Sequence, residues 1–228
     1  MPDFSKLIFL PLDMPSPPDI SETLDEIHNE GIDEQNMVTD NYRVSPSIIL
    51  MTPDGEWLPG IEDKIPEFVN WAETSLFNWA DRSQMVVITT PPGSSMAPHI
   101  DCSPHMFTDT WQHKFRCVIR GNTDTLRYIK KDGYEFVPDC EKTPYIIKGS
   151  WPHDMHNDFP LTKYTLCLGA PWEPDINNVR YMNMLNKSYK KNKEQYLSYE
   201  DWELPSNFRE LFNKERYGIV GKEITLNI

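Results

Sequence analysis

The sequence has 228 residues, of which 39% are hydrophobic and 12% aromatic, and a formal net charge of −13. A disordered chain is excluded by this apolar content, and the length is enough for one well-cored domain without requiring two. The negative charge argues against nucleic acid as the main partner, because phosphate binding needs clustered Lys and Arg.

Membrane insertion and secretion are not predicted either. No apolar run approaches the roughly 18 residues of a spanning helix. The run Leu7–Leu10 is too short for a signal peptide and is closed by Pro11. The four cysteines lack C-x-x-C spacing, so we interpret them as reduced thiols of an intracellular, cytoplasmic protein, with neither a zinc ribbon nor a thioredoxin motif. They are Cys102, Cys117, Cys140 and Cys167.

The first third of the chain predicts an extension of few elements. Residues 1 to 20 carry many prolines and are expected to form an extended arm, followed by a short acidic helix that ends near Asn29. Val44 to Met51 predicts a strand, placed at a sheet edge by Pro46. Pro66 opens a helix to about Ala80 whose apolar face is expected to pack in the core. That face carries Phe68, Trp71, Ala72, Leu76 and Trp79.

From Met85 onward, short strands separated by turn signals predict an antiparallel sandwich, barrel or jelly roll. The expected strands are Met85–Thr89, His113–Arg120, Thr125–Ile129, Tyr134–Val137, Pro144–Lys148 and Tyr164–Leu168. After Trp172 the pattern becomes helical, with an apolar face that includes Tyr181 and Leu185, and a last helix is expected around residues 208 to 212.

Three H-x-D/E pairs occur in the chain, where composition alone predicts about one. They are His28/Glu30, His99/Asp101 and His156/Asp158. Such a pair suits a metal in an extended segment, because side chains two residues apart then point the same way. His28 and Glu30 fall in a predicted helix, where they point to nearly opposite sides. His156 and Asp158 have no later histidine to complete a site.

His99 and Asp101 lie in extended sequence and are followed by a histidine 52 residues after Asp101, His153, in a turn that spans Gly149 to Asp158. Two histidines and one carboxylate hold Fe(II) on one face and leave the other positions open. We therefore predict a metal site of His99, Asp101 and His153. His156 is the alternative distal ligand, and His105 and His113 are interpreted as surface or loop residues.

Lys163 follows His153 by ten residues at the head of a strand. Alternation places Lys163, Thr165 and Cys167 on one face, where a cation and a hydroxyl can bind a carboxylate. In the strand at 114 to 120, alternation gives one face to Lys114, Arg116 and Arg120. We favour a functional role for Arg116, whereas Lys114 and Arg120 could equally be exposed charges on a solvent face.

In these residues the chain resembles the iron(II)- and 2-oxoglutarate-dependent oxygenases, whose pattern is H-x-D/E, a distal His and then a basic residue. His99-Ile100-Asp101, His153 and Lys163 match in order and spacing. The resemblance implies a mainly β fold with flanking helices on a double-stranded β-helix (jelly-roll) core at about residues 85 to 174. It implies Fe(II) on the triad, 2-oxoglutarate bound by Lys163, Thr165 and Arg116, and O2. We expect one domain over residues 1 to 228, with extensions at 1 to 84 and 175 to 228.

The nearest likeness within the superfamily is to aspartyl/asparaginyl β-hydroxylases. It rests on Ser150-Trp151-Pro152-His153, on Asn157-Asp158 and on Trp172-Glu173-Pro174. Two residues depart from that subfamily, which typically lacks the carboxylate ligand present here as Asp101 and often has Arg in place of Lys163.

The expected reaction is hydroxylation of a C–H bond in a peptide side chain or small amino-acid-like substrate, with release of succinate and CO2. The expected partners are therefore a small molecule or peptide, and neither nucleic acid nor a membrane. Two alternatives stay open: a jelly-roll module that binds or senses a metal without catalysis, and a cupin-type metalloenzyme that does not use 2-oxoglutarate. The loop from Ser103 to Trp111 could be a lid or a plain surface loop.

Overall fold

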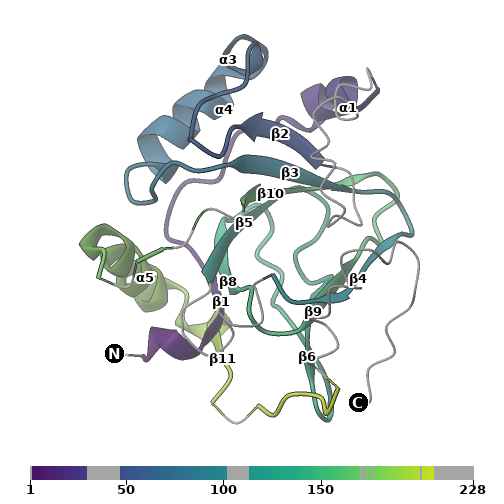
Figure 1. Ribbon diagram of the computed structural model, residues 1–228, viewed down its shortest axis with the longest axis vertical. Helices are drawn as coiled ribbons and strands as arrows, with labels where there is room; N and C mark the ends of the chain where they lie inside the picture. The colour runs from purple at the N-terminus through teal and green to yellow at the C-terminus, as the bar shows by residue number, and fades with distance from the viewer. Residues whose placement is uncertain are drawn as a thin grey trace.

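Two antiparallel sheets face each other in the computed structural model, and helices cover the outer side of the larger one (Figure 1). The structure describes residues 2–29, 47–101, 113–169, 172, 174–175, 177–200 and 202–207. The predicted helix at 208 to 212 and the loop from Ser103 to Trp111 lie outside these residues, as do His105 and Cys102.

The larger sheet has seven strands in the order β11-β1-β8-β5-β10-β3-β2. Their bounds are β1 Leu7–Pro11, β2 Ser47–Met51, β3 Met85–Thr90, β5 His113–Arg120, β8 Tyr145–Lys148, β10 Lys163–Leu168 and β11 Leu197–Ser198. The smaller sheet has four strands in the order β4-β9-β6-β7. They are β4 Ser95–His99, β6 Leu126–Lys130, β7 Gly133–Phe136 and β9 His153–His156.

The eight strands β3 to β10 pair in a nested way. β6 pairs with β7, β5 with β8, β4 with β9 and β3 with β10, all antiparallel. The chain thus runs as one long antiparallel ribbon, which closes on itself where β10 meets β5 and β9 meets β6. Ribbon strands alternating between two sheets in this order form a double-stranded β-helix, or jelly roll. The predicted fold class, mainly β with flanking helices, is confirmed.

Apolar side chains form two cores, one on each face of the larger sheet. Between the sheets lie Phe9, Val118, Leu126, Tyr128, Tyr145, Ile147 and Met155. The outer core includes Phe68, Leu76, Val87, Phe115, Ile146, Leu166, Tyr181 and Leu185. Each fully buried side chain of this size contributes about 1.5 to 3 kcal/mol. The larger sheet is therefore buried on both faces, which makes it a rigid support for the inner residues.

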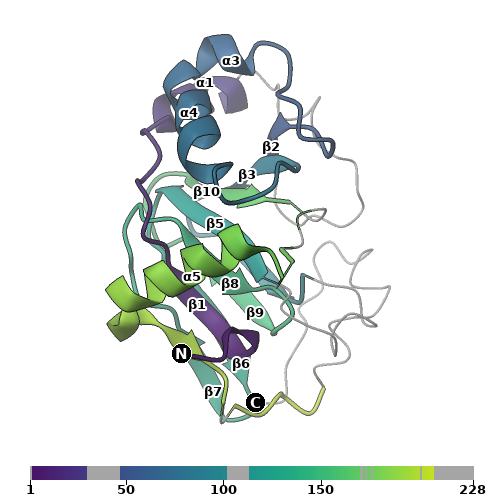
Figure 2. The ribbon, with the colours of Figure 1, turned by 90° about the vertical axis from the view of Figure 1, so that its left-hand side faces the viewer.

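The helices lie on the outer side of the larger sheet. α1 (Ser21–Asn29), α3 (Ile61–Lys64) and α4 (Pro66–Trp71) gather near β2 and β3, while α5 (Val179–Lys191) crosses over β1 and β8 (Figure 2). The predicted helix from Pro66 continues beyond α4 as a π-helical segment, η2 (Ala72–Leu76). Its predicted apolar face is buried as expected. Two short 3₁₀ turns, η1 (Phe4–Lys6) and η4 (Lys193–Gln195), also lie in the described part of the chain. No helix in the described ranges is long and apolar enough to cross a membrane.

Two sequence-based expectations about local structure are wrong. The first 20 residues are not simply an extended arm, because β1 lies between β8 and β11 in the larger sheet and is buried throughout. The segment Gly149–Asp158 is not only a turn, because His153–His156 forms β9, between β4 and β6. Its polar residues suggest a loop. The segment forms an interior strand because β4 and β6 pair with its backbone on both sides. The edge position predicted for β2 is confirmed.

A β-bulge in β5 changes which way its cations point. Val118 lies opposite Thr165, but Arg120 lies opposite Tyr164, so Ile119 is an extra residue. Opposed residues share a face, and the bulge therefore turns Arg120 to the outer side with Tyr164. The expectation that Arg120 shares a face with Arg116 is wrong for this reason.

Candidate metal centre

His99, Asp101 and His153 come from two adjacent strands of the smaller sheet. His99 is the last residue of β4 and lies directly opposite His153, the first residue of β9. A register shift between Met96 and His99 accompanies Pro98, which has no N–H to donate and fits the edge position of β4. The backbone N–H of Asp101 donates to Gly149 O at 2.8 Å, which fixes the residue beyond the strand end.

The three side chains converge on one point. His99 Nε2 lies 3.3 Å from Asp101 Oδ1, and His153 Nε2 lies 3.5 Å from Asp101 Oδ2. One ligand atom from each residue lies within 4.8 Å of the others, and within the described ranges this is the one such group of His, Cys, Asp or Glu residues. The His153 side chain is 5% exposed, whereas His99 and Asp101 are 18% and 20% exposed. The triad is therefore buried on the side of His153 and partly exposed to solvent on the side of His99 and Asp101.

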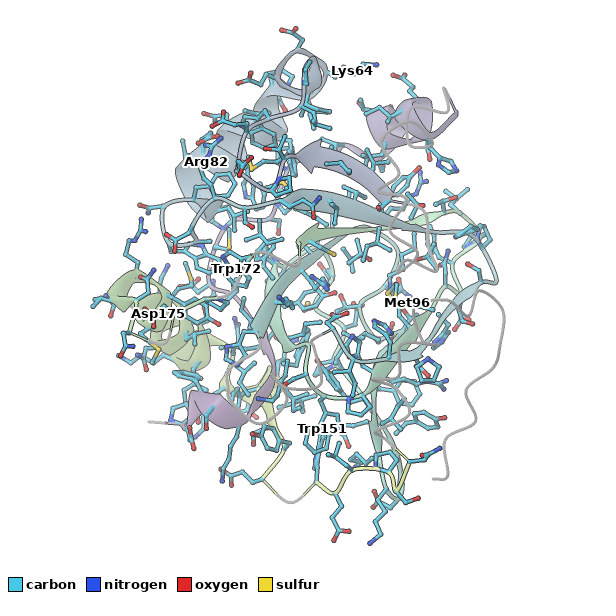
Figure 3. The ribbon with its side chains drawn as sticks, viewed as in Figure 1. Lys64, Arg82, Met96, Trp151, Trp172 and Asp175 are labelled. Atoms are coloured by element: carbon cyan, nitrogen blue, oxygen red, sulfur yellow. The ribbon has the colours of Figure 1, made fainter. Side chains whose placement is uncertain are left out.

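His153 is held in one tautomer by the backbone before it. Its Nδ1 lies 2.7 Å from Trp151 O, so Nδ1–H donates to this carbonyl, and in the neutral imidazole the Nε2 lone pair faces the triad. Trp151 is itself fixed, because its indole N–H donates to Ile129 O at 2.9 Å. Its ring packs against Trp202 with centroids 5.7 Å apart, at the lower end of the molecule in Figure 3.

Asp101 is an ionised carboxylate in this arrangement. Burial raises its pKa, but hydrogen bonds and positive charge from His153 and His99, in the forms that carry a proton on Nε2, outweigh that effect and hold the pKa well below its usual range. Arg116 donates from its NH2 group to Asp101 Oδ2 at 3.1 Å. The same guanidinium donates to the carbonyls of Phe115 and Leu168 at 3.0 and 3.4 Å, so it spans from β5 and β10 to the triad.

Lys163 is the first residue of β10 and is 1% exposed. Its ammonium donates to Asn122 O at 2.5 Å and to the Thr125 hydroxyl. Burial lowers its pKa to about 8, an effect that Asp124, Asp139 and Asp158 partly oppose. None of the carboxylates in the described segments forms an ion pair with it. A buried ammonium without a counter-ion fits an anionic ligand.

Two hydroxyls accompany this ammonium on the inner face. Thr165 shares its face by alternation, and Thr90 lies directly opposite Lys163 on β3. Both hydroxyl oxygens are buried and have no hydrogen-bond partner within the described part of the chain. An unsatisfied buried hydroxyl costs about 1 to 3 kcal/mol, which a ligand could offset. Sequence reasoning missed Thr90, since only the pairing of β3 with β10 relates it to Lys163.

The loop between β9 and β10 is held by Asn157. Its side-chain amide donates to Thr90 O at 2.7 Å and to Leu161 O at 2.9 Å, while its oxygen accepts from the Phe159 N–H. These bonds join the loop to the end of β3, so β10 begins at Lys163 opposite Thr90.

The remaining candidates have other partners. His156 Nε2 pairs with Asp158 Oδ2 at 3.0 Å and is not in the triad, which favours His153 as the distal ligand. His113 is a buried strand residue bonded to the Tyr181 hydroxyl, so its assignment to the surface is wrong. Lys114 is buried and donates to Trp172 O at 3.1 Å, so it is not an exposed solvent charge.

Comparisons with known proteins add the following. No protein-family model matches the chain, and no curated protein does. Similar solved structures include a prolyl hydroxylase in complex with a hypoxia-inducible-factor oxygen degradation domain peptide from Trichoplax adhaerens, at 12% identity and a TM-score of 0.42, covering 72% of this chain and 82% of that one. A Pseudomonas putida prolyl-4-hydroxylase has 14% identity, a TM-score of 0.40 and coverages of 69% and 90%.

A viral collagen prolyl hydroxylase from Paramecium Bursaria Chlorella virus-1 has 11% identity and a TM-score of 0.36, with coverages of 63% and 86%. Likenesses this distant concern the fold alone. What the protein does must be argued from its own residues.

Proposed function

We propose that this protein is an Fe(II)- and 2-oxoglutarate-dependent oxygenase that hydroxylates a C–H bond. The observation that carries the proposal is the convergence of His99, Asp101 and His153 at an opening of a double-stranded β-helix. Two imidazoles and one carboxylate on one side of a metal are the donor set of non-haem Fe(II) oxygenases, in which the opposite positions stay free.

The residues present fit the metal and the cosubstrate. Iron bound there would supply the oxidative chemistry, in which 2-oxoglutarate and O2 give succinate and CO2 and one oxygen atom enters the substrate C–H bond. The His153 tautomer directs a lone pair at the metal position. Arg116 holds Asp101 in place, and the low pKa keeps that carboxyl ionised and ready to bind a cation.

Lys163 is the proposed anchor for the far carboxylate of 2-oxoglutarate. A charge-assisted hydrogen bond to the buried ammonium would provide the missing counter-ion. The unpartnered hydroxyls of Thr165 and Thr90 would complete the binding site on the same face. We assign Arg116 first to Asp101, which it contacts, and its direct contact with 2-oxoglutarate stays a prediction.

The substrate class is proposed only from the resemblance. A peptide side chain or a small amino-acid-like molecule is expected, and the subfamily likeness to aspartyl/asparaginyl β-hydroxylases stays a prediction. The division into a catalytic core at about residues 85 to 174 and two extensions, within one domain, is proposed on the same basis.

The test begins with anaerobic titration of Fe(II) and then 2-oxoglutarate, followed by a succinate assay across candidate peptides and amino acids. His99→Ala and Asp101→Ala should abolish succinate formation, while His156→Ala, which leaves the triad intact, should retain it. Full activity in either ligand variant would refute the assignment.

The same experiment separates the alternatives. A module that only binds or senses a metal would bind Fe(II) without forming succinate. A cupin-type enzyme that does not use 2-oxoglutarate would show no binding of that acid, and Lys163→Met would leave its turnover unchanged.

A further inference from the structure

Three polar side chains on the outer face of the larger sheet form a hydrogen-bonded cluster next to Lys163. Arg120 donates to both carboxylate oxygens of Asp25, at 2.6 and 2.5 Å, and Asp25 belongs to α1, 95 residues away in the chain. Tyr164 donates its hydroxyl to Asp25 at 2.6 Å, and the Arg120 guanidinium lies 4.5 Å from the centre of the Tyr164 ring. A bidentate Arg–carboxylate pair is directional and hard to replace.

The cluster contacts the backbone on each side of Lys163. Arg120 Nε donates to Thr162 O at 2.8 Å, immediately before Lys163. Tyr164, immediately after it, is held by Asp25 through its hydroxyl. The two residues that flank Lys163 are therefore fixed from the outer face, while the Lys163 side chain points to the inner face.

The chain after Arg120 wraps the Lys163 side chain. Gly121 has a φ of +110°, and a Cβ there would lie 2.8 Å from Lys163 Cγ, so only glycine lets the backbone pass so close. The next residue, Asn122, accepts the Lys163 ammonium through its carbonyl oxygen. Any movement of Arg120 would thus shift the two residues that shape the path of the Lys163 side chain.

We propose that Asp25 is a positioning residue for the cosubstrate anchor: by holding Arg120, it sets where the Lys163 ammonium lies and thereby the affinity for 2-oxoglutarate. This inference rests on the proposed function, since it gives the short acidic helix α1 a role at that same site. Asp25 itself touches no reacting group and works through Arg120, Thr162 and the Gly121–Asn122 turn.

The test measures equilibrium binding of 2-oxoglutarate, titrated anaerobically into Fe(II)-loaded protein and followed by calorimetry. Asp25→Asn keeps the size of the side chain but removes its charge. It should raise the dissociation constant about tenfold, the low end of what loss of a supporting partner costs. Fe(II) affinity, and kcat at saturating 2-oxoglutarate, should stay as in the wild type. A purely structural role would instead lower the melting temperature without this selective change.

Asp19→Asn is the matched control. Asp19 pairs with Lys142 through an exposed ion pair just before α1, and its substitution removes one such pair without touching Arg120. It should leave the dissociation constant unchanged. Asp25→Glu, which restores the charge, should recover part of the affinity. The double variant Asp25→Asn/Arg120→Met should be no weaker than Arg120→Met alone, because the two residues act as one unit.

The outcomes separate this inference from the proposed function. If Lys163→Met weakens 2-oxoglutarate binding but Asp25→Asn binds as the wild type does, the positioning role is refuted and the oxygenase assignment stands. If the wild type does not bind 2-oxoglutarate, or Lys163→Met binds it unchanged, the proposed anchor is refuted and the role of Asp25 falls with it.

Discussion

Two cations on opposite faces of the larger sheet differ in their partners. Arg120, on the outer face, is bonded to both oxygens of the Asp25 carboxylate. Lys163, on the inner face, has only a carbonyl and a hydroxyl as hydrogen-bond partners, with no carboxylate among the residues described. They are close in the sheet, since Arg120 lies opposite Tyr164.

Under the proposed function, this difference separates a charge that positions other residues from a charge that binds a ligand. A charged group that is paired and bidentate completes its environment within the fold. A buried charge without a counter-ion carries a cost that folding alone does not explain, and such groups concentrate at functional sites. The unsatisfied hydroxyls of Thr165 and Thr90 beside Lys163 point the same way.

Removal of the Lys163 charge is expected to have the largest effect on cosubstrate binding. Lys163→Met keeps most of the side-chain volume and should raise the dissociation constant of 2-oxoglutarate about 10- to 100-fold, the value of a hydrogen bond to a charged group. Because burial disfavours the ammonium, the ligand-free variant should be as stable as the wild type within about 1 kcal/mol, or more stable. Calorimetry and urea denaturation measure the two quantities. A large loss of stability with unchanged binding would reverse the distinction between the two cations.

The corresponding change on the outer face should lower stability in addition to its effect on cosubstrate affinity. Arg120→Met leaves Asp25 without its cation and removes the bond to Thr162 O, so the free energy of unfolding should fall by about 1 to 2 kcal/mol. Arg180→Met is the control, since its exposed pair with Asp81 should contribute under about 0.5 kcal/mol. Urea denaturation measures both. Equal, small losses in the two variants would show that the Arg120 cluster is not structural.

The pKa of Lys163 predicts how binding depends on pH. The protonated ammonium binds the anion, and burial lowers its pKa to about 8, so 2-oxoglutarate affinity should be steady below pH 8 and fall as the pH rises above it, approaching tenfold per unit. Over the same range the ligand-free protein should gain stability, because the folded state loses a proton that the unfolded chain still holds. Lys163→Arg stays charged and should remove the pH dependence. Binding isotherms measured across this pH range check the prediction. It is contradicted if the affinity for 2-oxoglutarate changes with pH in the same way in the wild type and in Lys163→Arg.

The residues of the candidate metal site were predictable because they follow short-range sequence patterns. H-x-D spacing in an extended segment selects His99 and Asp101, and the ten-residue spacing to Lys163 selects His153 over His156. Alternation along β10 also predicts that Lys163 and Thr165 share a face. The H-x-D pair and the shared face of β10 need only the period of a strand, whereas the ten-residue spacing is a pattern that the resemblance to the oxygenases supplies.

What the sequence did not reveal depends on pairings between distant segments. The bulge at Ile119 turns Arg120 outward, and Asp25 meets it from a helix 95 residues away. Register across β3 and β10 brings Thr90 to Lys163, and β9 is a strand because β4 and β6 flank it. The periodicity of side chains within one segment contains no information about these pairings. The substrate, the domain division and the cytoplasmic location also stay predictions.

The smallest expected effect concerns the hydroxyl of Thr165. Thr165→Val replaces an unpartnered buried hydroxyl by a methyl group of similar size, so the ligand-free protein should become more stable by up to about 1 kcal/mol. If that hydroxyl binds the 2-oxoglutarate carboxylate, the dissociation constant should rise about 3- to 10-fold. Thr125→Val is the useful contrast, because its hydroxyl already bonds Lys163 and Asn122 O, and its loss should lower stability. A Thr165→Val protein that is less stable and binds the cosubstrate normally would mean that this hydroxyl serves the fold and not the ligand.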